Sequence, residues 1–453
     1  MGESLGGTMD ETSGSAAISP KLQRVAQLAK AMPQVALTTL AHHMDLDLLL
    51  EAYRLTRKDG AVGVDGQSGR EYAETLDENL RGLVERAKAG TYHAPPVRRV
   101  RIPKGTGAKT RPIGIPTFED KVLQRAVAML LGAVYEQDFR ACSYGFRPHR
   151  SAHQALQVLW EAVMRRQGGW VLELDIEDFF GSLDHQRLRG ILRRRVRDGV
   201  VLRLIGKWLR AGVLEAGTLT YPEAGTPQGG VISPLLANVY LHEVLDEWFE
   251  DVVRPRLRGA ATLVRFADDA VLVFAREEDA RRVAAVLPKR LARYGLTLHP
   301  EKTRLVSFQQ PRSSRRCMGA RAGTFDFLGF THYWSHSRRG YPIVKRHTAQ
   351  DRMTRALRAI RRWCRAQRHL PIAAQHHALK RKLQGHDAYY GITGNAPALE
   401  RYRYEVRRIW RKWLDRRSNR ARMGWDRFRF VLARYPLPPA RVVQSVYRLA
   451  ASP

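Results

Sequence analysis

Cysteine, acidic residues and long apolar runs are all scarce in this sequence of 453 residues. The three cysteines, Cys142, Cys317 and Cys364, stand far apart and form no Cys-x-x-Cys pair. This argues against a disulfide framework and against a zinc site, and it favours a reducing, cytoplasmic compartment. No apolar run is long enough to span a bilayer, and residues 1–20 are rich in Gly and Ser. We therefore expect no membrane partner, no signal peptide and a flexible N-terminus.

Charge of one sign dominates the chain. It holds 77 Lys and Arg against 44 Asp and Glu, for a net charge of +33. Residues 331–453 alone carry 29 basic and 6 acidic side chains. An imbalance of this size indicates a polyanionic partner, most simply nucleic acid. The length and the hydrophobic fraction of 44% are sufficient for a large core, divided over roughly two to four domains.

Two adjacent aspartates, Asp268 and Asp269, interrupt an apolar stretch at 263–274. Apolar, β-branched runs on both sides predict two strands joined by a tight turn. Carboxylates at the tip of a buried hairpin suit a hard cation such as Mg²⁺. On this segment alone, an ordinary solvated turn is an equally good interpretation, since Asp is common in turns.

Three further segments carry polar groups that fit the same chemistry. Residues 98–111 hold six Lys or Arg and no acid, and they predict a basic β-hairpin that either binds phosphate or is simply solvated. The apolar run 170–176 predicts a buried strand that ends at Asp175. The Gly-rich segment 223–230 can bring its backbone close to a nucleotide. Asp175, Asp268 and Asp269 could thus converge on two Mg²⁺ ions for nucleotidyl transfer.

Hydrophobic periodicity predicts helices through most of 21–90, at 119–136, 151–165, 233–250 and 277–294, and along the Arg-rich region beyond 330. A second β-hairpin is predicted at 296–308. Tryptophans Trp410, Trp413 and Trp425 are expected mainly in the core of the C-terminal helices, with docking on RNA as the alternative.

The order of these motifs resembles that of group II intron-encoded reverse transcriptases. Phe-Ala-Asp-Asp at 266–269 is similar to the YADD box, with Phe266 in place of Tyr. The other matching segments are 101–104 with 111–116, 143–148, 174–185, 225–234, 327–330 and 389–418. The last segment, with its Tyr-Tyr-Gly and Trp residues, resembles the thumb and maturase region. Gly181 departs from the Asp often found after the Phe-Phe pair.

The resemblance implies an α+β, right-hand polymerase fold. Its fingers and palm, with an antiparallel sheet, would span 91–330 after a helical extension at 21–90, and a helical thumb and basic maturase-type region would span 331–453. It implies that Asp175, Asp268 and Asp269 are catalytic and hold two Mg²⁺ ions together with the Ile176 carbonyl. Nucleotide contacts are implied for five further residues: Lys104, Arg111, Phe180, Gln228 and Lys302. Phe180 would be the steric gate against a 2′-hydroxyl.

The implied function is RNA-directed DNA polymerase of a group II intron in the bacterial cytoplasm. Its partners would be an RNA template, intron RNA, a DNA primer or target, and dNTPs. The sequence shows no Cys/His cluster near its end, so an appended HNH-type endonuclease is not expected. Two alternatives remain: an RNA-binding maturase that needs no catalysis, and a domesticated reverse transcriptase that serves phage defence.

Overall fold

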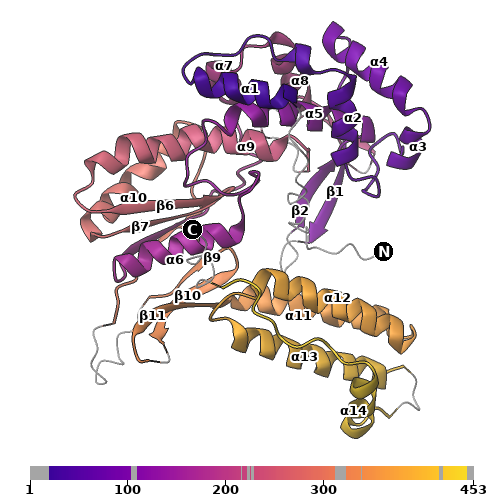
Figure 1. Cartoon of the computed structure of the whole chain (residues 1–453), viewed down its shortest axis with the longest axis vertical. Coiled ribbons are helices and arrows are strands. Elements are labelled where there is room, and N and C mark those ends of the chain that lie inside the picture. Colours follow the sequence, from indigo (N-terminus) through magenta and orange to yellow (C-terminus); the bar gives the residue numbers. More distant parts are fainter. Residues whose placement is uncertain are drawn as a thin grey trace. The chain divides into compact units, whose positions relative to one another are not determined.

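The computed structural model describes residues 20–103, 110–215, 217–221, 225, 229–311, 323–337, 339–417 and 422–445 (Figure 1). The N-terminal segment 1–19 and the residues Lys104, Gln228 and Cys317 lie outside these ranges. Internal contacts divide the chain into two compact units. Among the described residues, the larger unit comprises those of 20–155 and 172–305, and the smaller comprises those of 156–171 and 306–445. The domain boundaries expected from the sequence remain predictions.

The first part of the larger unit is helical, as predicted for 21–90. It contains α1 (Pro20–Ala31), the 3₁₀ turn η2 (Ala41–His43), α2 (Leu46–Leu55), α3 (Gly69–Ala73), α4 (Leu76–Ala89) and α5 (Phe118–Tyr135). Side-chain caps begin three of these helices: Asp45 accepts a hydrogen bond from the Leu48 amide, Ser68 from the Glu71 amide, and Thr117 from the Asp120 amide. The central helix α5 is buried, and both α1 and α2 pack against it.

The predicted basic hairpin is present. Strands β1 (Val97–Pro103) and β2 (Thr110–Ile115) pair antiparallel, with Ile102 opposite Arg111. The short strands β4 (Val213–Glu215) and β5 (Thr218–Thr220) extend this sheet in the order β2-β1-β4-β5.

A second sheet has the order β6-β7-β3-β8. Its strands are β3 (Trp170–Leu174), β6 (Ala261–Phe266), β7 (Asp269–Phe274) and β8 (Arg304–Ser307). Helix α10 (Glu277–Ala292) packs against β7. Helix α9 (Ser233–Leu241) continues as the π-helix η3 (His242–Val253) and the 3₁₀ turn η4 (Arg254–Arg256), where a continuous α-helix was predicted.

The hairpin predicted at 296–308 is wrong. Leu298 instead forms an isolated antiparallel bridge with Ile176, and β8 lies beside β3 in the sheet. Both halves of the segment therefore pair with the chain around Asp175 and not with each other. Alternation along the sequence identifies a strand but not its partner, because the partner is chosen by tertiary packing.

Two further helices belong to the larger unit: α7 (His185–Arg195) and α8 (Gly199–Leu209). Helix α6 (Ala152–Arg165) lies mostly in the smaller unit. Asp184 caps α7 and Asp198 caps α8, each through its carboxylate. Helix α7 contacts both α8 and α9.

The smaller unit was expected to be helical beyond 330, and the structure differs there. Strands β10 (Phe330–His336) and β11 (Pro342–Thr348) pair antiparallel, and β9 (Phe325–Phe327) joins them in the order β11-β10-β9. The buried positions of β11 alternate as Val344, Arg346 and Thr348. Two of these three are polar, so an apolar period of two is not visible in the sequence.

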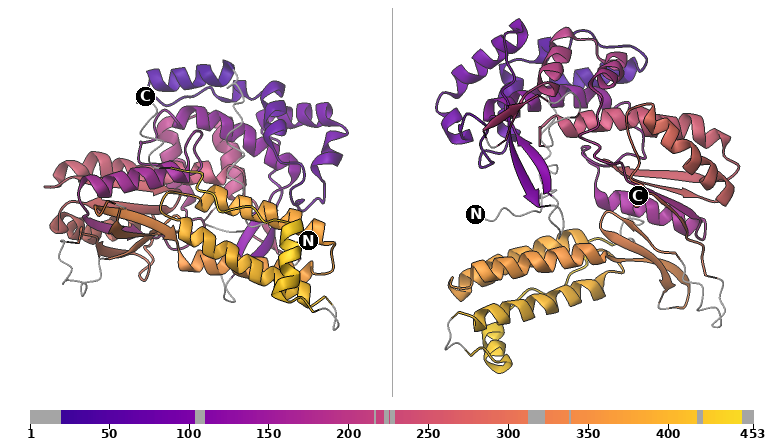
Figure 2. Two further views of the ribbon diagram at one scale, coloured as in Figure 1. Left: turned by 60° about the horizontal axis from the view of Figure 1, so that its bottom comes forward. Right: turned by 180° about the vertical axis from the view of Figure 1, so that it is seen from behind.

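Four helices follow: α11 (Gln350–Ala366), α12 (Ile372–Tyr390), α13 (Ala396–Asp415) and α14 (Trp425–Arg434). Figures 1 and 2 show α11, α12 and α13 running alongside one another, and α13 contacts both of its neighbours. Trp410 is fully buried in their core, and Trp413 packs against it. Trp425 is 44% exposed, with the Arg411 guanidinium 4.5 Å from its ring centre. Among the helices that the structure describes, each is too short or too polar to cross a bilayer.

Candidate active site

The β6–β7 hairpin places Asp268 in a strained two-residue turn. Strand β6 ends at Phe266, which pairs with Asp269 at the start of β7, so Ala267 and Asp268 form the turn. Ala267 has φ 56°, a left-handed conformation that is costly for a residue with a Cβ. Tight hairpin turns require positive φ, and residues held in this region cluster at functional sites.

Asp268 and Asp175 lie close enough to influence each other electrostatically. Burial raises the pKa of the Asp268 carboxyl, and Asp175 raises it further, whereas Arg111 and Arg265 act in the opposite direction. Asp175 follows the last residue of β3, and its carbonyl accepts a hydrogen bond from the His299 amide. Two carboxylates that repel each other in this way are stabilised by a nearby cation.

Lys302 supplies one such cation. Its Nζ atom lies 2.6 Å from Oδ2 of Asp175. The chain reaches this position because Leu298 bridges Ile176 and the Lys302 amide bonds back to the His299 carbonyl. Ile176 itself is buried in this pairing.

Asp269 differs from the other two acids, because its side chain is exposed. Within the ranges that the structure describes, no three Asp, Glu, His or Cys side chains are grouped closely enough to hold a metal ion. The residues nonetheless fit a divalent cation. Asp175 and Asp268 repel each other, and Asp175 already forms an ion pair with the Lys302 ammonium.

Phe180 lies in the turn after β3, half-buried, with its ring 5.3 Å from that of Phe179. Gly225 lies very close to this turn, since a Cβ atom on residue 225 would lie 2.8 Å from the Phe180 carbonyl oxygen. At Gly181, a Cβ atom would lie 2.1 Å from Oδ2 of Asp178. The carboxylate of Asp178 therefore occupies the space that a side chain at position 181 would need.

Of the basic residues predicted to bind phosphate, several are engaged elsewhere. Arg98 donates to the Val62 carbonyl, and Arg99 and Arg101 both pair with Glu215. Arg111 is exposed and acts on Asp268 across the site. Arg111 therefore lies near enough to Asp268 to be a candidate for nucleotide contact.

Arg265, which precedes the hairpin turn, was not predicted from the sequence as a functional residue, yet its hydrogen bonds hold the turn in place. Arg265 is fully buried and forms a two-point ion pair with Asp246, with N–O distances of 2.7 and 2.5 Å. It also donates to Asn238 Oδ1, Ser143 Oγ and the Ala267 carbonyl, at 2.9, 2.7 and 3.0 Å. Burial alone would lower the pKa of Arg265, but Asp246 outweighs it and raises that pKa.

Gly145 completes the support of the turn. A Cβ atom there would lie 2.4 Å from the Ala267 amide nitrogen, so only glycine permits this close approach. Asn238 donates to the Gly145 carbonyl at 2.7 Å, and the Tyr144 amide donates to the Arg265 carbonyl. A charged residue within the apolar strand 261–266 was the signal for this network, because a buried Arg requires a partner.

Comparison with known proteins places these features in a family. The family model described as "Reverse transcriptase (RNA-dependent DNA polymerase)" matches residues 102–332, about half of the chain. The matched range contains all nine residues proposed above for catalysis, metal and nucleotide.

Individual relatives agree with this match. Group II intron-encoded protein LtrA of Lactococcus lactis subsp. cremoris is 44% identical over 170 residues, 37% of this chain and 28% of that protein. Protein YkfC of Escherichia coli K12 is 35% identical over 256 residues, 50% of this chain and 67% of that protein. Retron Mx162 reverse transcriptase of Myxococcus xanthus is 28% identical over 286 residues, 58% of this chain and 56% of that protein.

The match to LtrA thus covers little more than a quarter of that protein's length. The family model and the coverage of YkfC support the assignment. Asp175 and Asp268 lie inside both the matched range and the larger unit. The chain therefore belongs to the reverse transcriptase (RNA-dependent DNA polymerase) family.

Proposed function

We propose that this protein copies RNA into DNA, with Asp175 and Asp268 as the central catalytic carboxylates and Asp269 beside them. The observation that carries the proposal is the proximity of Asp175, which follows β3, to Asp268, which precedes the neighbouring strand β7. Burial and repulsion by Asp175 raise the pKa of Asp268. Arg111 and Lys302 bring positive charge to the same place. Lys104 and Gln228, outside the described residues, are proposed as further nucleotide contacts.

Reverse transcriptases typically use divalent metal ions, and we propose Mg²⁺ at Asp175, Asp268, Asp269 and the Ile176 carbonyl. A pair of such ions stabilises the attacking and leaving oxygens of a phosphoryl transfer. The protein would hold the carboxylates in position: Asp175 at the end of β3, and Asp268 in the strained turn that contains Ala267. Arg111 would compensate the charge of the triphosphate.

In the proposed right-hand arrangement, β1 and β2 belong to the fingers and the β6-β7-β3-β8 sheet to the palm. Helices α11 to α13 would form the thumb and the maturase-type region. The antiparallel pairing of β6 with β7 and the single core of the C-terminal helices support this division.

The test is incorporation of labelled dNTPs on a primed RNA template with Mg²⁺, with EDTA and an unprimed template as controls. The proposal expects extension that depends on primer, template and metal. Folded protein that binds primed RNA but extends no primer would contradict it.

Substitution of Phe180 with valine is expected to raise rNTP relative to dNTP incorporation by roughly 10-fold to 100-fold, because a bulky ring rejects the 2′-hydroxyl by steric clash. Phe180→Tyr keeps the bulk and is the matched control. The measurement is the kcat/KM ratio for the two nucleotides on one template. An unchanged ratio in Phe180→Val would assign the ring to packing against Phe179 alone.

Removal of the Lys302 ammonium is expected to tighten Mg²⁺ binding about 2-fold to 5-fold, since a partly exposed ion pair contributes up to about 1 kcal/mol. Lys302→Met frees the Asp175 carboxylate, whereas Lys289→Met changes an exposed lysine of α10 and serves as the control. Calorimetric titration of Mg²⁺ without nucleotide measures this directly. Weaker binding in Lys302→Met would show that the lysine helps to build the metal site.

We further propose that the protein binds group II intron RNA and assists splicing and retrohoming. The similarity to intron-encoded proteins and the positive charge of residues 331–453 support this. Purified protein should bind an intron RNA encoded around its own coding sequence more tightly than a size-matched structured RNA, and should accelerate its splicing. If no such RNA flanks the gene, a domesticated reverse transcriptase is the better interpretation; if splicing survives loss of Asp268, the maturase role is independent of catalysis.

A further inference from the structure

Helices α7 and α8 concentrate positive charge outside the candidate active site. Between residues 185 and 214 the sequence holds nine Lys or Arg and a single acid, Asp198. That acid does not offset the charge at the surface, because it is buried and accepts hydrogen bonds from the amides of Leu40, Ala41, Val200 and Val201. The basic character of the chain is therefore not confined to its C-terminal quarter.

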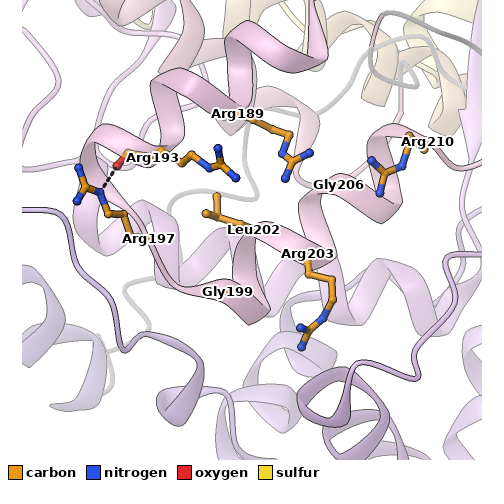
Figure 3. Close-up of a pocket in the computed structure, with 8 residues that line it drawn as sticks. All are labelled: Arg189, Arg193, Arg197, Gly199, Leu202, Arg203, Gly206 and Arg210. Carbon is orange, nitrogen blue, oxygen red and sulfur yellow. Dashed lines mark hydrogen bonds between the residues drawn. The ribbon is translucent and has the colours of Figure 1, made fainter.

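Five of these arginines line one hollow of about 450 Å³ between the two helices. They are Arg189, Arg193, Arg197, Arg203 and Arg210. Figure 3 shows Arg189 and Arg193 reaching from α7 and Arg203 extending from α8, with Leu202 between the helices. Residues four apart on a helix lie about 6 Å apart along its axis, so Arg189 and Arg193 form a short row on one side.

The arginines of the hollow differ from the other arginines of this stretch. Each of the others contacts a carboxylate: Arg187 with Asp184, Arg194 with Glu243, and Arg195 with Asp138. Within the described residues, no carboxylate lies within ion-pair distance of any of the five in the hollow. Their hydrogen bonds are to backbone carbonyls, from Arg197 to Arg193 and from Arg203 to Lys88.

Arg189 adds a second indication. Its Nε atom is buried and has no hydrogen-bond partner among the described residues. A buried donor without an acceptor costs free energy, so an incoming anion with oxygen acceptors would be stabilised there. The floor of the hollow is apolar at Leu202 and lacks side chains at Gly199 and Gly206, which leaves the guanidinium groups as the groups that meet a ligand.

We propose that this hollow binds the phosphodiester backbone of RNA, at a site separate from polymerisation. Guanidinium groups bind phosphate through two parallel hydrogen bonds, and an arginine-lined surface of this kind recognises the backbone and not the base sequence. None of its lining residues belongs to the proposed catalytic, metal or nucleotide set. The choice of RNA over DNA rests on the proposed RNA-copying function, whereas the anion-binding property does not.

The test uses a fluorescent RNA stem-loop without a primer terminus, titrated with full-length protein at several KCl concentrations. The variant Arg193→Gln/Arg203→Gln/Arg210→Gln removes three exposed arginines from the hollow. We expect roughly a 10-fold weaker Kd and a fall of about 2 to 3 in the slope of log K against log salt, since each lost phosphate contact removes about one unit or less. Arg70→Gln/Arg276→Gln/Arg293→Gln removes the same charge from exposed positions of the same unit and should change the slope far less.

Equal losses in the two triple variants would overturn the proposal, because they would reflect net charge alone. A DNA duplex of the same sequence is titrated as a second probe. If the hollow variant loses affinity for the DNA but not for the RNA stem-loop, the proposal is also overturned. The variant Arg193→Lys/Arg203→Lys/Arg210→Lys retains the charge and should keep most of the wild-type slope. Primer extension on a short RNA template is measured in parallel. If the hollow variant extends the primer but binds the stem-loop weakly, the hollow is distinct from the polymerase site. If the wild type extends no primer, only the proposed function is contradicted.

Discussion

Asp268→Asn is expected to reduce RNA-templated dNTP incorporation by about 10³-fold or more, since metal-held charge stabilises such a transition state by several kcal/mol. The substitution keeps the size of the side chain but removes the charge that would hold a cation with Asp175. Asp77→Asn, at an exposed ion pair with Arg81, is the matched control and should retain full activity. Single-turnover extension rates at saturating Mg²⁺ make the comparison. Activity within 10-fold of the wild type would exclude Asp268 as a principal metal ligand.

The same substitution should make the metal-free protein more stable. The pKa of Asp268 is raised in the folded protein, so the fold disfavours its ionised form. Above the unfolded-state pKa, the ionised carboxylate therefore destabilises the protein, and this loss disappears as pH falls through the raised, folded-state pKa. At neutral pH without Mg²⁺, Asp268→Asn should raise Tm by about 1–3 °C, and the difference should vanish at acidic pH. A lower Tm at neutral pH would show that the carboxylate is structurally satisfied without metal.

As the pH is lowered, dNTP incorporation by the wild type should decline at a higher pH than protonation of an ordinary aspartate would predict. The reason is the raised pKa of Asp268, which is protonated at a higher pH than usual. Excess Mg²⁺ competes with that proton and should shift the midpoint of the decline to lower pH. A midpoint that is independent of Mg²⁺ would indicate that another group titrates.

Breaking the Arg265–Asp246 pair is expected to have the largest effect on folding. Both side chains are fully buried, so removal of one partner leaves an unpaired charge and costs about 3–5 kcal/mol. Asp246→Ala should therefore lower the free energy of unfolding by about that amount, measured by urea titration. Replacing both partners with apolar residues, as in Arg265→Met/Asp246→Leu, should recover most of the stability.

The double variant separates positioning from stability. It should still lose about 10²-fold in kcat, because a small displacement of a reacting group is that costly. Without the guanidinium, the Ala267 carbonyl, Asn238 and Ser143 lose the donor that holds the turn. Its Mg²⁺ requirement should rise with the loss of kcat, whereas KM for dNTP should change little. Wild-type stability together with wild-type kcat would show that the network only supports the fold.

Local pattern was sufficient for much of the scaffold. Apolar, β-branched runs identified both strands of the hairpin around Asp268 and Asp269, and the basic turn after residue 97 identified the hairpin of β1 and β2. Both are local antiparallel pairs joined by short turns. Helical periodicity located α5, α6 and α10 to within a few residues. The ordered motifs also resemble those of reverse transcriptases, and the family match confirms that resemblance.

Long-range pairing required the tertiary structure. Leu298 reaches Ile176 and Lys302 reaches Asp175 across more than a hundred residues, and no local pattern encodes either contact. The partners of Arg265 come from three other segments, so only the folded chain shows that it holds the Ala267 turn. The arginine hollow is of the same kind: the charges are visible along the sequence, but the fold decides which of them meet a carboxylate.

For this protein, the sequence by itself determined most of the helices, two local hairpins, the excess of positive charge and the acids proposed for metal binding. Only the tertiary structure decided which acids face each other, which cations neutralise them and which remain exposed on a surface. The physical reason is the distance along the chain over which each interaction acts. Periodicity and turn preference act over a few residues, whereas burial and electrostatic pairing act between segments that the whole fold brings together.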